Sequence, residues 1–191
     1  MARLVGHKGV DTGLRVLAAL RQAFPDLRYA IVGSGPMQVQ LETLARDLGV
    51  EQLVRFLTGV PDEDLPALYN SAEIYLGLSR AEGLLMEGFG ISLVEASACG
   101  IPVVGARQGG IPDAVREGET GLLVDSTDLP AIVEVVRSLL ENQELARRLG
   151  LEGRRAVETY FNWDRVTAEV RRTGDEMAGD RPGNDREAGD P

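Results

Sequence analysis

The sequence lacks several features that would place the protein outside the cytoplasm or on a nucleic acid. It has a single cysteine, Cys99, so no internal disulfide can form. No apolar run approaches the roughly 20 residues that a membrane helix needs, and no signal peptide opens the chain. The formal net charge is −10, from 20 basic and 30 acidic residues, so a basic footprint for nucleic acid is absent. We therefore expect a cytoplasmic protein without a membrane span and without a nucleic-acid partner.

Lysine is also nearly absent. Lys8 is the one lysine among the 20 residues counted as Lys or Arg, and the others are all arginine. The lysine ammonium is a compact point charge, whereas the arginine guanidinium is a planar fork. Lys8 is therefore either an accident of composition or the mark of a site that needs an ammonium. His7 beside it is expected to be exposed.

The order of apolar segments indicates the fold class. The chain has 191 residues, 43% of them hydrophobic, which fits one globular domain. Strand-like segments alternate with helical ones about six times. This alternation predicts an α/β, Rossmann-like fold, with a doubly wound, mostly parallel sheet and helices on both faces. Ligands in such sheets bind at the carboxyl ends of the strands. The predicted strands are 28–32, 53–57, 74–78, 102–105 and 121–124, with the end of another at 2–5.

The composition changes at residue 174. Residues 174–191 contain six acidic residues, two arginines, four glycines and two prolines, and little that is apolar. Such a segment cannot bury enough surface to offset the entropy lost on ordering. We therefore divide the chain into a domain at 1–173 and a disordered acidic tail at 174–191.

Residues 86–113 hold the most specific pattern, in which two carboxylates flank the start of a predicted helix at 91–98. Glu87 precedes the helix and Glu95 lies on it, so at about 1.5 Å per residue they are roughly 12 Å apart. This separation suits two ends of one extended ligand better than a metal site. Between them, the N–H groups of Gly90 to Ser92 leave the helix N-terminus, which favours phosphate. A surface helix with two solvated glutamates explains the same spacing.

A second candidate loop is Gly33-Ser34-Gly35-Pro36, which follows a predicted strand and precedes a predicted helix. In such a unit the glycines let the backbone approach a ligand's phosphate or ribose. A plain tight turn without any ligand accounts for the same residues.

The segment from Glu87 to Ala96 resembles the E-x7-E motif of retaining, nucleotide-sugar-dependent glycosyltransferases of family 4. The runs 98–104 and 109–112 match that family too. There, the first glutamate and the following backbone amides hold the donor sugar, and the second glutamate binds the ribose. The resemblance thus implies Glu87 as a catalytic residue, Gly90 and Ile91 at the donor diphosphate, and Glu95 at the ribose.

The same resemblance extends to the start of the chain. Arg3 and Lys8 bracket a turn and look like the family's basic pair, which holds the diphosphate. Without the resemblance, the two residues would be interpreted as ordinary solvent-exposed side chains. Two fixed cations stabilise a departing diphosphate without a metal, so no metal and no other cofactor is expected. Loop contacts near the nucleotide base are implied for four residues: Gly33, Gly35, Gly59 and Val60.

The resemblance covers residues 2 to about 170 and implies one half of a GT-B fold, which has two facing Rossmann-like domains. The chain would be the donor-binding half of a hexosyltransferase that uses a UDP-sugar or GDP-sugar. It would be inactive alone, with the amino-terminal GT-B domain as its partner. The loop between Ser79 and Glu87 resembles the subset that includes phosphatidylinositol mannosyltransferases. Exposed Phe89 and Ile91 would favour self-association.

A stand-alone nucleotide-binding module without catalysis is the alternative function. A dinucleotide-binding oxidoreductase is disfavoured, because no G-x-G-x-x-G follows the first strand.

Overall fold

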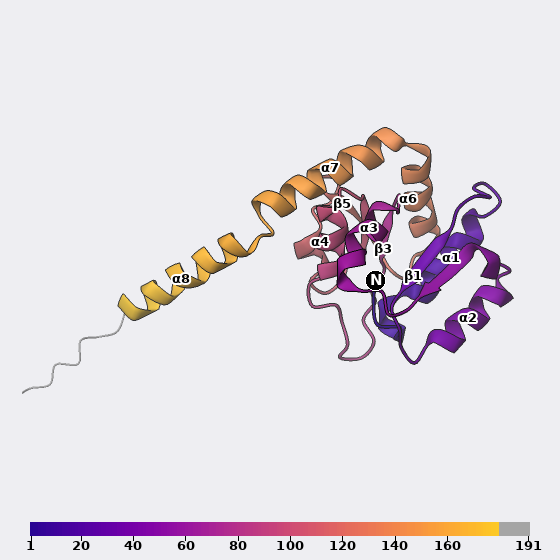
Figure 1. Ribbon diagram of the computed structural model, residues 1–191, viewed down its shortest axis with the longest axis horizontal. Helices are drawn as coiled ribbons and strands as arrows, with labels where there is room; N and C mark the ends of the chain where they lie inside the picture. Colours follow the sequence, from indigo (N-terminus) through magenta and orange to yellow (C-terminus); the bar gives the residue numbers. More distant parts are fainter. Residues whose placement is uncertain (180–191) are drawn as a thin grey trace, which may run out of the picture.

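The computed structural model describes residues 1–179, an α/β domain from which the last helix projects (Figure 1). Its strands are β1 (Tyr29–Val32), β2 (Val54–Leu57), β3 (Tyr75–Gly77), β4 (Val103–Ala106) and β5 (Gly121–Val124). Its helices are α1 (Val10–Leu20), α2 (Gln38–Asp47), α3 (Leu65–Asn70), α4 (Ile91–Ala98), α5 (Ile111–Ala114), α6 (Leu129–Glu141), α7 (Gln143–Thr159) and α8 (Trp163–Gly179). Three 3-10 turns are η1 (Gly6–Lys8), η2 (Glu51–Leu53) and η3 (Asp62–Asp64).

The strands are parallel, as predicted, but they form two sheets within the described residues. β1 pairs with β2, with Tyr29 opposite Val54. The second sheet has the order β3-β4-β5, with Tyr75 opposite Val103 and Val103 opposite Gly121. Among the described residues, β1 and β3 do not pair with each other. The α/β class with parallel strands is confirmed.

The predicted strand end at 2–5 is not a strand in the structure, although it begins to pair like one. The Ala2 N–H donates to the Val32 carbonyl at 2.9 Å, and the Leu4 N–H donates to the Ser34 carbonyl at 2.8 Å. The first bond is to the last residue of β1 and the second is to the loop after it, so the segment runs alongside that loop.

Helices cover both faces of the β3-β4-β5 sheet, because neighbouring side chains of a strand point to opposite faces. Val104 of β4 packs with residues of α1, α6 and α7. Val103 packs on the other face with Leu93 of α4 and Ile111 of α5. A third cluster joins α1 and α2 to β1 and β2, with Leu14, Ile31 and Leu41 among its buried residues.

Two helices begin directly after a glycine in the left-handed conformation. α4 begins after Gly90, whose left-handed φ of 88° turns the chain into the helix, and its bounds are those predicted. α1 begins at Val10 after Gly9, and Asp11 lies in its first turn. The Asp11 carboxylate accepts from the Arg80 guanidinium, at 2.9 and 3.0 Å.

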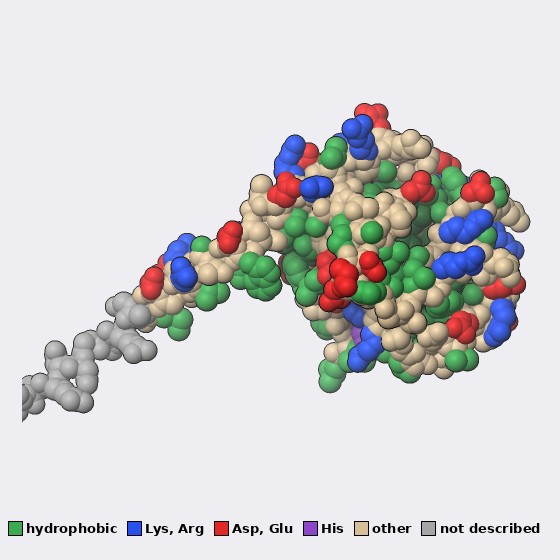
Figure 2. Space-filling view, in the orientation of Figure 1, with side chains coloured by type: hydrophobic (Ala, Val, Ile, Leu, Met, Phe, Trp, Pro, Cys, Tyr) green, Lys and Arg blue, Asp and Glu red, His purple; other side chains and the backbone are tan. Residues whose placement is uncertain are grey.

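α8 runs to Gly179, six residues past the predicted domain end at 173. Its exposed side chains Trp163, Val170 and Met177 are seven residues apart, so they lie along one side of the helix. Figure 2 shows hydrophobic side chains gathered along the lower side of α8 in that view. The remainder of the predicted tail, 180–191, lies outside the described residues, and the division at 173 stays a prediction.

Among residues 1–179, no helix has the length and apolar character needed to span a membrane.

Candidate functional site

Lys8 and Glu87 lie at the carboxyl ends of the parallel strands, the usual ligand edge of such folds. Lys8, the last residue of η1, contacts Glu87, which lies in the loop that follows β3. The Lys8 Nζ donates to the Glu87 Oε2 at 2.6 Å. The Ser79 hydroxyl donates to the same carboxylate oxygen at 3.1 Å. Both charged side chains keep about a fifth of their surface exposed, 22% for Lys8 and 20% for Glu87.

These contacts keep Glu87 ionised. Burial opposes its ionisation, but the hydrogen bond and charge of Lys8, with the Ser79 hydroxyl, outweigh burial and lower the pKa of Glu87 below its usual 4.5. At neutral pH Glu87 is therefore an anion that accepts hydrogen bonds. Because the folded-state pKa is depressed, the pair stabilises the fold above pH 4.5, and this stability is lost as pH falls through the lower folded-state pKa.

Two glycines bring the loops of this site together. Gly9 has a left-handed φ of 67°, and a Cβ there would lie 1.9 Å from the Leu78 carbonyl oxygen. η1, which carries Lys8, can therefore lie directly against the end of β3. Gly110 donates its N–H to the Glu87 carbonyl at 3.0 Å, and a Cβ on it would lie 1.9 Å from the Gly88 carbonyl oxygen. Bare backbone at these positions thus holds Lys8 and Glu87 in place.

The N-terminus of α4 opens directly after this pair. The N–H groups of Leu93 and Val94 donate to the Gly90 carbonyl, and these are the first hydrogen bonds of the helix. The N–H groups of Ile91 and Ser92 come before them and have no carbonyl partner within the helix. Gly90 is buried, whereas Ile91 is 68% exposed. The predicted arrangement of a carboxylate followed by a helix end is therefore present.

Glu95 lies in a separate cluster further along α4. The buried Tyr69 of α3 donates its hydroxyl to the Glu95 Oε2 at 2.7 Å. Burial, the neighbouring Tyr75 and this hydrogen bond raise the pKa of Tyr69, so Tyr69 stays a donor. Within residues 1–179, no hydrogen bond reaches the Glu95 Oε1, which leaves one oxygen of this carboxylate available to a ligand.

The other predicted site residues lie outside these two clusters of hydrogen bonds. Arg3 is exposed, and no described side chain forms an ion pair with it. Gly33 and Gly35 lie against the backbone of Ala2 and Leu4, where added Cβ atoms would come within 1.9 and 2.4 Å of carbonyl oxygens. Gly59 is exposed after β2, with Val60 half-buried beside it. Across residues 1–179, no group of three metal-ligating side chains is close enough to hold a metal ion.

Sequence reasoning missed several supporting contacts. The Ser79 and Tyr69 hydroxyls, which bond to the two glutamates, carried no motif signal for that role. His7 was expected to be exposed, but it is 7% exposed, because η1 turns it inward and the Arg80 N–H donates to its carbonyl at 2.7 Å. Its Nδ1 has no hydrogen-bond partner among the described residues. His7 is buried because it contacts Arg80, which is 73 positions away in the sequence. A local sequence pattern does not show such a contact.

Parallel strands, glycine-supported loops at their carboxyl ends and a helix N-terminus between two carboxylates define a Rossmann-like, nucleotide-binding class of domain. Residues 1–156 match the family model described as glycosyl transferases group 1. The chain therefore belongs to the group 1 glycosyltransferase family, the family that the E-x7-E motif indicated. Within that family it corresponds to the carboxyl-terminal domain of the GT-B fold.

Curated relatives agree with this assignment. A GDP-mannose-dependent alpha-(1-6)-phosphatidylinositol monomannoside mannosyltransferase of Mycolicibacterium smegmatis is 43% identical over 165 residues, covering 85% of this chain and 43% of that protein. A D-inositol 3-phosphate glycosyltransferase of Corynebacterium glutamicum is 38% identical over 176 residues, covering 89% and 41%. The chain thus spans less than half the length of the curated relatives it matches.

Solved structures agree on the fold. The C-terminal domain of the LpcC glycosyl transferase from Francisella tularensis has a TM-score of 0.76 and 20% identity, with 85% of this chain and 84% of that one covered. Anabaena HepE in complex with UDP has a TM-score of 0.82 and 24% identity, with 92% and 47% covered. At these identities the likeness supports the fold alone.

Proposed function

We propose that this chain is the donor-binding half of a retaining glycosyltransferase, which moves a hexose from a nucleoside diphosphate sugar to an acceptor. The observation that carries the proposal is the Lys8–Glu87 pair at 2.6 Å, directly before the N-terminus of α4. A cation, a carboxylate and free N–H groups are thereby combined where a diphosphate and its sugar would meet. The second carboxylate, Glu95, lies further along the same helix.

Each predicted residue has a role in this proposal. Glu87, kept anionic by Lys8 and Ser79, accepts hydrogen bonds from the hydroxyls of the donor sugar. The Lys8 ammonium lies between this carboxylate and the diphosphate, and it stabilises the negative charge that the diphosphate gains on leaving, without a metal. The free oxygen of Glu95 accepts from the ribose. The remaining proposed contacts are Arg3, Gly90 and Ile91 to the diphosphate, and Gly33, Gly35, Gly59 and Val60 near the base.

The relatives suggest which donor to test first. Four are GDP-mannose-dependent mannosyltransferases at 35–43% identity, and the Ser79–Glu87 loop resembles that subset. We therefore propose GDP-mannose as the donor, with UDP-sugars as the comparison. The single cysteine, Cys99, is unpaired, which fits a cytoplasmic site of action.

We expect the isolated chain to bind the donor and to transfer no sugar. Transfer needs an acceptor oxygen held about 3–3.5 Å from the anomeric carbon, in a site that excludes water. The assigned residues all serve the donor, and the loop beside them exposes apolar side chains, with Leu84 99% and Met86 58% exposed. We propose that this apolar loop faces the amino-terminal GT-B domain and favours self-association without it.

The measurement is donor turnover by this chain alone and with an amino-terminal GT-B domain added. Sustained transfer by the chain alone would contradict the half-enzyme assignment. Donor binding without turnover, even with the added domain, would favour the stand-alone binding module.

We expect Glu95→Gln to weaken ribonucleotide binding about 10- to 100-fold, from loss of a charge-assisted hydrogen bond. The Tyr69 hydroxyl donates to one carboxylate oxygen. In the variant it would take the single amide oxygen, so an NH2 group would face the ribose in place of an acceptor. Calorimetry with GDP and 2′,3′-dideoxy-GDP measures the effect, which should be small for the dideoxy nucleotide. The control is Glu134→Gln on α6, an exposed position; equal losses for both nucleotides would show that Glu95 only supports the helix.

A further inference from the structure

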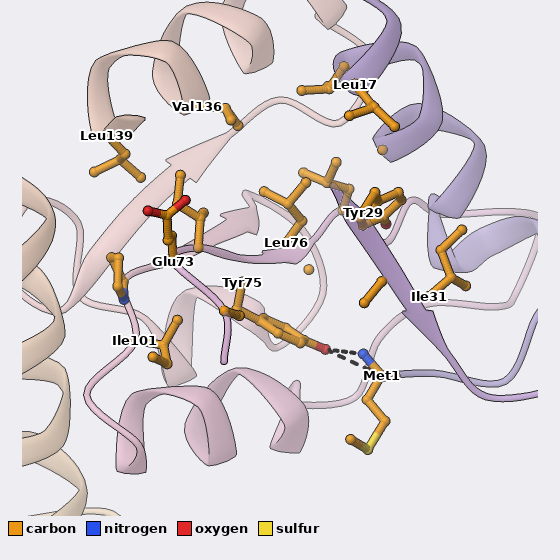
Figure 3. A pocket seen from close by; sticks show the side chains of 18 of the residues that line it. Met1, Leu17, Tyr29, Ile31, Glu73, Tyr75, Leu76, Ile101, Val136 and Leu139 are labelled. Atoms are coloured by element: carbon orange, nitrogen blue, oxygen red, sulfur yellow. Dashed lines mark hydrogen bonds between the residues drawn. The ribbon is translucent and has the colours of Figure 1, made fainter. Parts of the chain in front are cut away.

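An aromatic pair lies beside Glu95, the carboxylate further along α4. The Tyr69 ring packs against the Tyr75 ring, with centroids 5.7 Å apart. Figure 3 shows Tyr75 beside a cavity that it helps to line, with its hydroxyl accepting from the Met1 amino group at 2.9 Å. Because Tyr69 also donates to Glu95, this pair supports the carboxylate that is proposed to bind the ribose.

A second aromatic pair lies beside the other carboxylate, Glu87. Phe89 lies between Glu87 and Gly90, and its ring meets the Phe161 ring edge-on, with centroids 5.9 Å apart and planes at 60°. Aromatic rings prefer this kind of arrangement. Phe89 is 36% exposed, so most of its surface is covered. Neither phenylalanine is part of the three apolar clusters found among residues 1–179, so the pair lies apart from the core.

Phe161 reaches this loop because α7 packs antiparallel to α4. A Cβ on Gly150 of α7 would overlap the Gly100 carbonyl oxygen, just past the end of α4. One turn further along α7, a Cβ on Gly153 would lie 3.3 Å from the side chain of Ser97, which is one turn earlier on α4. Continued in this register, the chain that leaves α7 passes the residues that precede α4.

The junction between α7 and α8 fixes the position of Phe161. The Tyr160 and Phe161 N–H groups both donate to the Ala156 carbonyl, at 2.8 and 3.1 Å. The Tyr160 ring lies perpendicular to the Phe161 ring, with centroids 5.1 Å apart. The Arg165 guanidinium lies 4.0 Å from the Tyr160 ring centroid, and the Arg165 N–H donates to the Asn162 side-chain oxygen at 2.9 Å. Phe161 is therefore a fixed support for the ring that rests on it.

The loop that Phe161 contacts has little side-chain packing of its own. Gly88 and Gly90 flank Phe89, and neither has a side chain. A Cβ on Gly88 would meet nothing within 4 Å, and Met86, which precedes Glu87, is 58% exposed. Phe89 is thus the one side chain between Glu87 and α4 that can hold this segment by packing.

We propose that Phe161 is a positioning residue of the donor site, which acts through Phe89 to fix the loop from Glu87 to Gly90. The inference rests on the proposed function, in which this loop holds the sugar and the diphosphate of the donor. In this role Phe161 touches neither of them. Without its ring, Phe89 is free to move, and the carboxylate and N–H groups of the loop lose their common geometry. Glu95 and the contacts near the base lie on other segments and keep theirs.

The test compares Phe161→Ala with Leu151→Ala, which removes an apolar side chain of α7 that is 54% exposed. Calorimetry with GDP-mannose and GMP measures binding. We expect Phe161→Ala to weaken GDP-mannose binding about three- to tenfold, the range for an aromatic pair, and to change GMP binding less than about twofold. Leu151→Ala should change neither. Phe89→Ala should give the same loss, and the double variant should lose no more, because Phe161 acts through Phe89.

Carbon NMR of the Glu87 carboxyl group in the chain without nucleotide is the second measurement. In Phe161→Ala, a displaced loop should weaken the Lys8 contact that lowers the pKa of Glu87, so this pKa should rise toward its usual 4.5. An unchanged Glu87 pKa, equal losses for GDP-mannose and GMP, or additive losses in the double variant would overturn the proposal. If the unmodified chain binds no nucleotide, the proposed function fails, and the Glu87 pKa alone decides whether Phe161 positions the loop.

Phe161→Leu covers the case in which the alanine variant does not fold. Leucine keeps much of the apolar volume but removes the ring edge that meets Phe89. We expect the same selective loss of GDP-mannose binding and the same direction of change in the Glu87 pKa. Urea unfolding shows that each variant is folded under the conditions of the titration. A folded leucine variant with unchanged GDP-mannose binding and an unchanged Glu87 pKa would then overturn the proposal.

Discussion

Replacing Lys8 with alanine is expected to weaken binding of a nucleoside diphosphate about 10- to 100-fold. A charge-assisted hydrogen bond contributes roughly 1.5–3 kcal/mol, and each 1.4 kcal/mol is about tenfold in affinity. The monophosphate should lose much less, because it lacks the phosphate that the ammonium is proposed to reach. Calorimetry with GDP and GMP measures both losses. Arg171→Ala, which also removes one positive charge from an exposed position, is the control and should change neither affinity.

The same substitution should raise the pKa of Glu87. Lys8 supplies the hydrogen bond and the main charge that lower this pKa, against the opposing effect of burial. In the variant, Glu87 should therefore protonate at a higher pH, and the range over which acid removes its stabilising contribution should move upward. Carbon NMR of the Glu87 carboxyl group follows the titration. Equal affinity losses for GDP and GMP, with an unchanged Glu87 pKa, would contradict the role given to Lys8.

Gly110→Ala is expected to destabilise the fold by about 1–3 kcal/mol, the range for overpacking a well-packed site, and to weaken donor binding as well. The added Cβ would lie 1.9 Å from the Gly88 carbonyl oxygen, which is backbone and not a side chain that can rotate away. The loop must move, which breaks the bond from the Gly110 N–H to the Glu87 carbonyl, now 3.0 Å. Glu87 would then lose its fixed position against Lys8. Urea unfolding and calorimetry measure the two effects.

Gly88→Ala is the matched control for this change. Gly88 lies in the same pair of loops, but a Cβ there meets nothing within 4 Å. It also lacks a positive φ, so alanine should be tolerated, with a small effect on stability. If the two variants were equally stable and bound donor equally well, the close approach at Gly110 would not be what positions Glu87.

Local patterns were enough to predict most elements. α4 and β5 have the predicted bounds, because a left-handed glycine and short apolar runs mark their ends. The Glu87–Glu95 motif could likewise be predicted, since Glu87 directly before α4 and Glu95 on it are close in the sequence.

Contacts between distant residues could not be predicted in this way. Lys8 and Glu87 are 79 residues apart, and the sequence paired Lys8 with Arg3, which the structure leaves exposed. The split into two sheets depends on which strands become neighbours, and strand periodicity does not encode that choice. The inward turn of His7 likewise depends on η1 packing beneath Arg80. Such pairings are set by tertiary packing, which overrides local preference.

The most direct test of the central claim, that this chain holds a nucleotide-sugar donor at Lys8, Glu87 and Glu95, is a calorimetric titration with GDP-mannose. The titration is run in EDTA, beside UDP- and ADP-sugars, on the unmodified chain and on its Lys8→Ala and Glu95→Gln variants. The account predicts one binding site per chain, retained without metal and weakened about tenfold or more in both variants. A folded chain that binds none of these nucleotide sugars, or binds one unchanged in both variants, would contradict it.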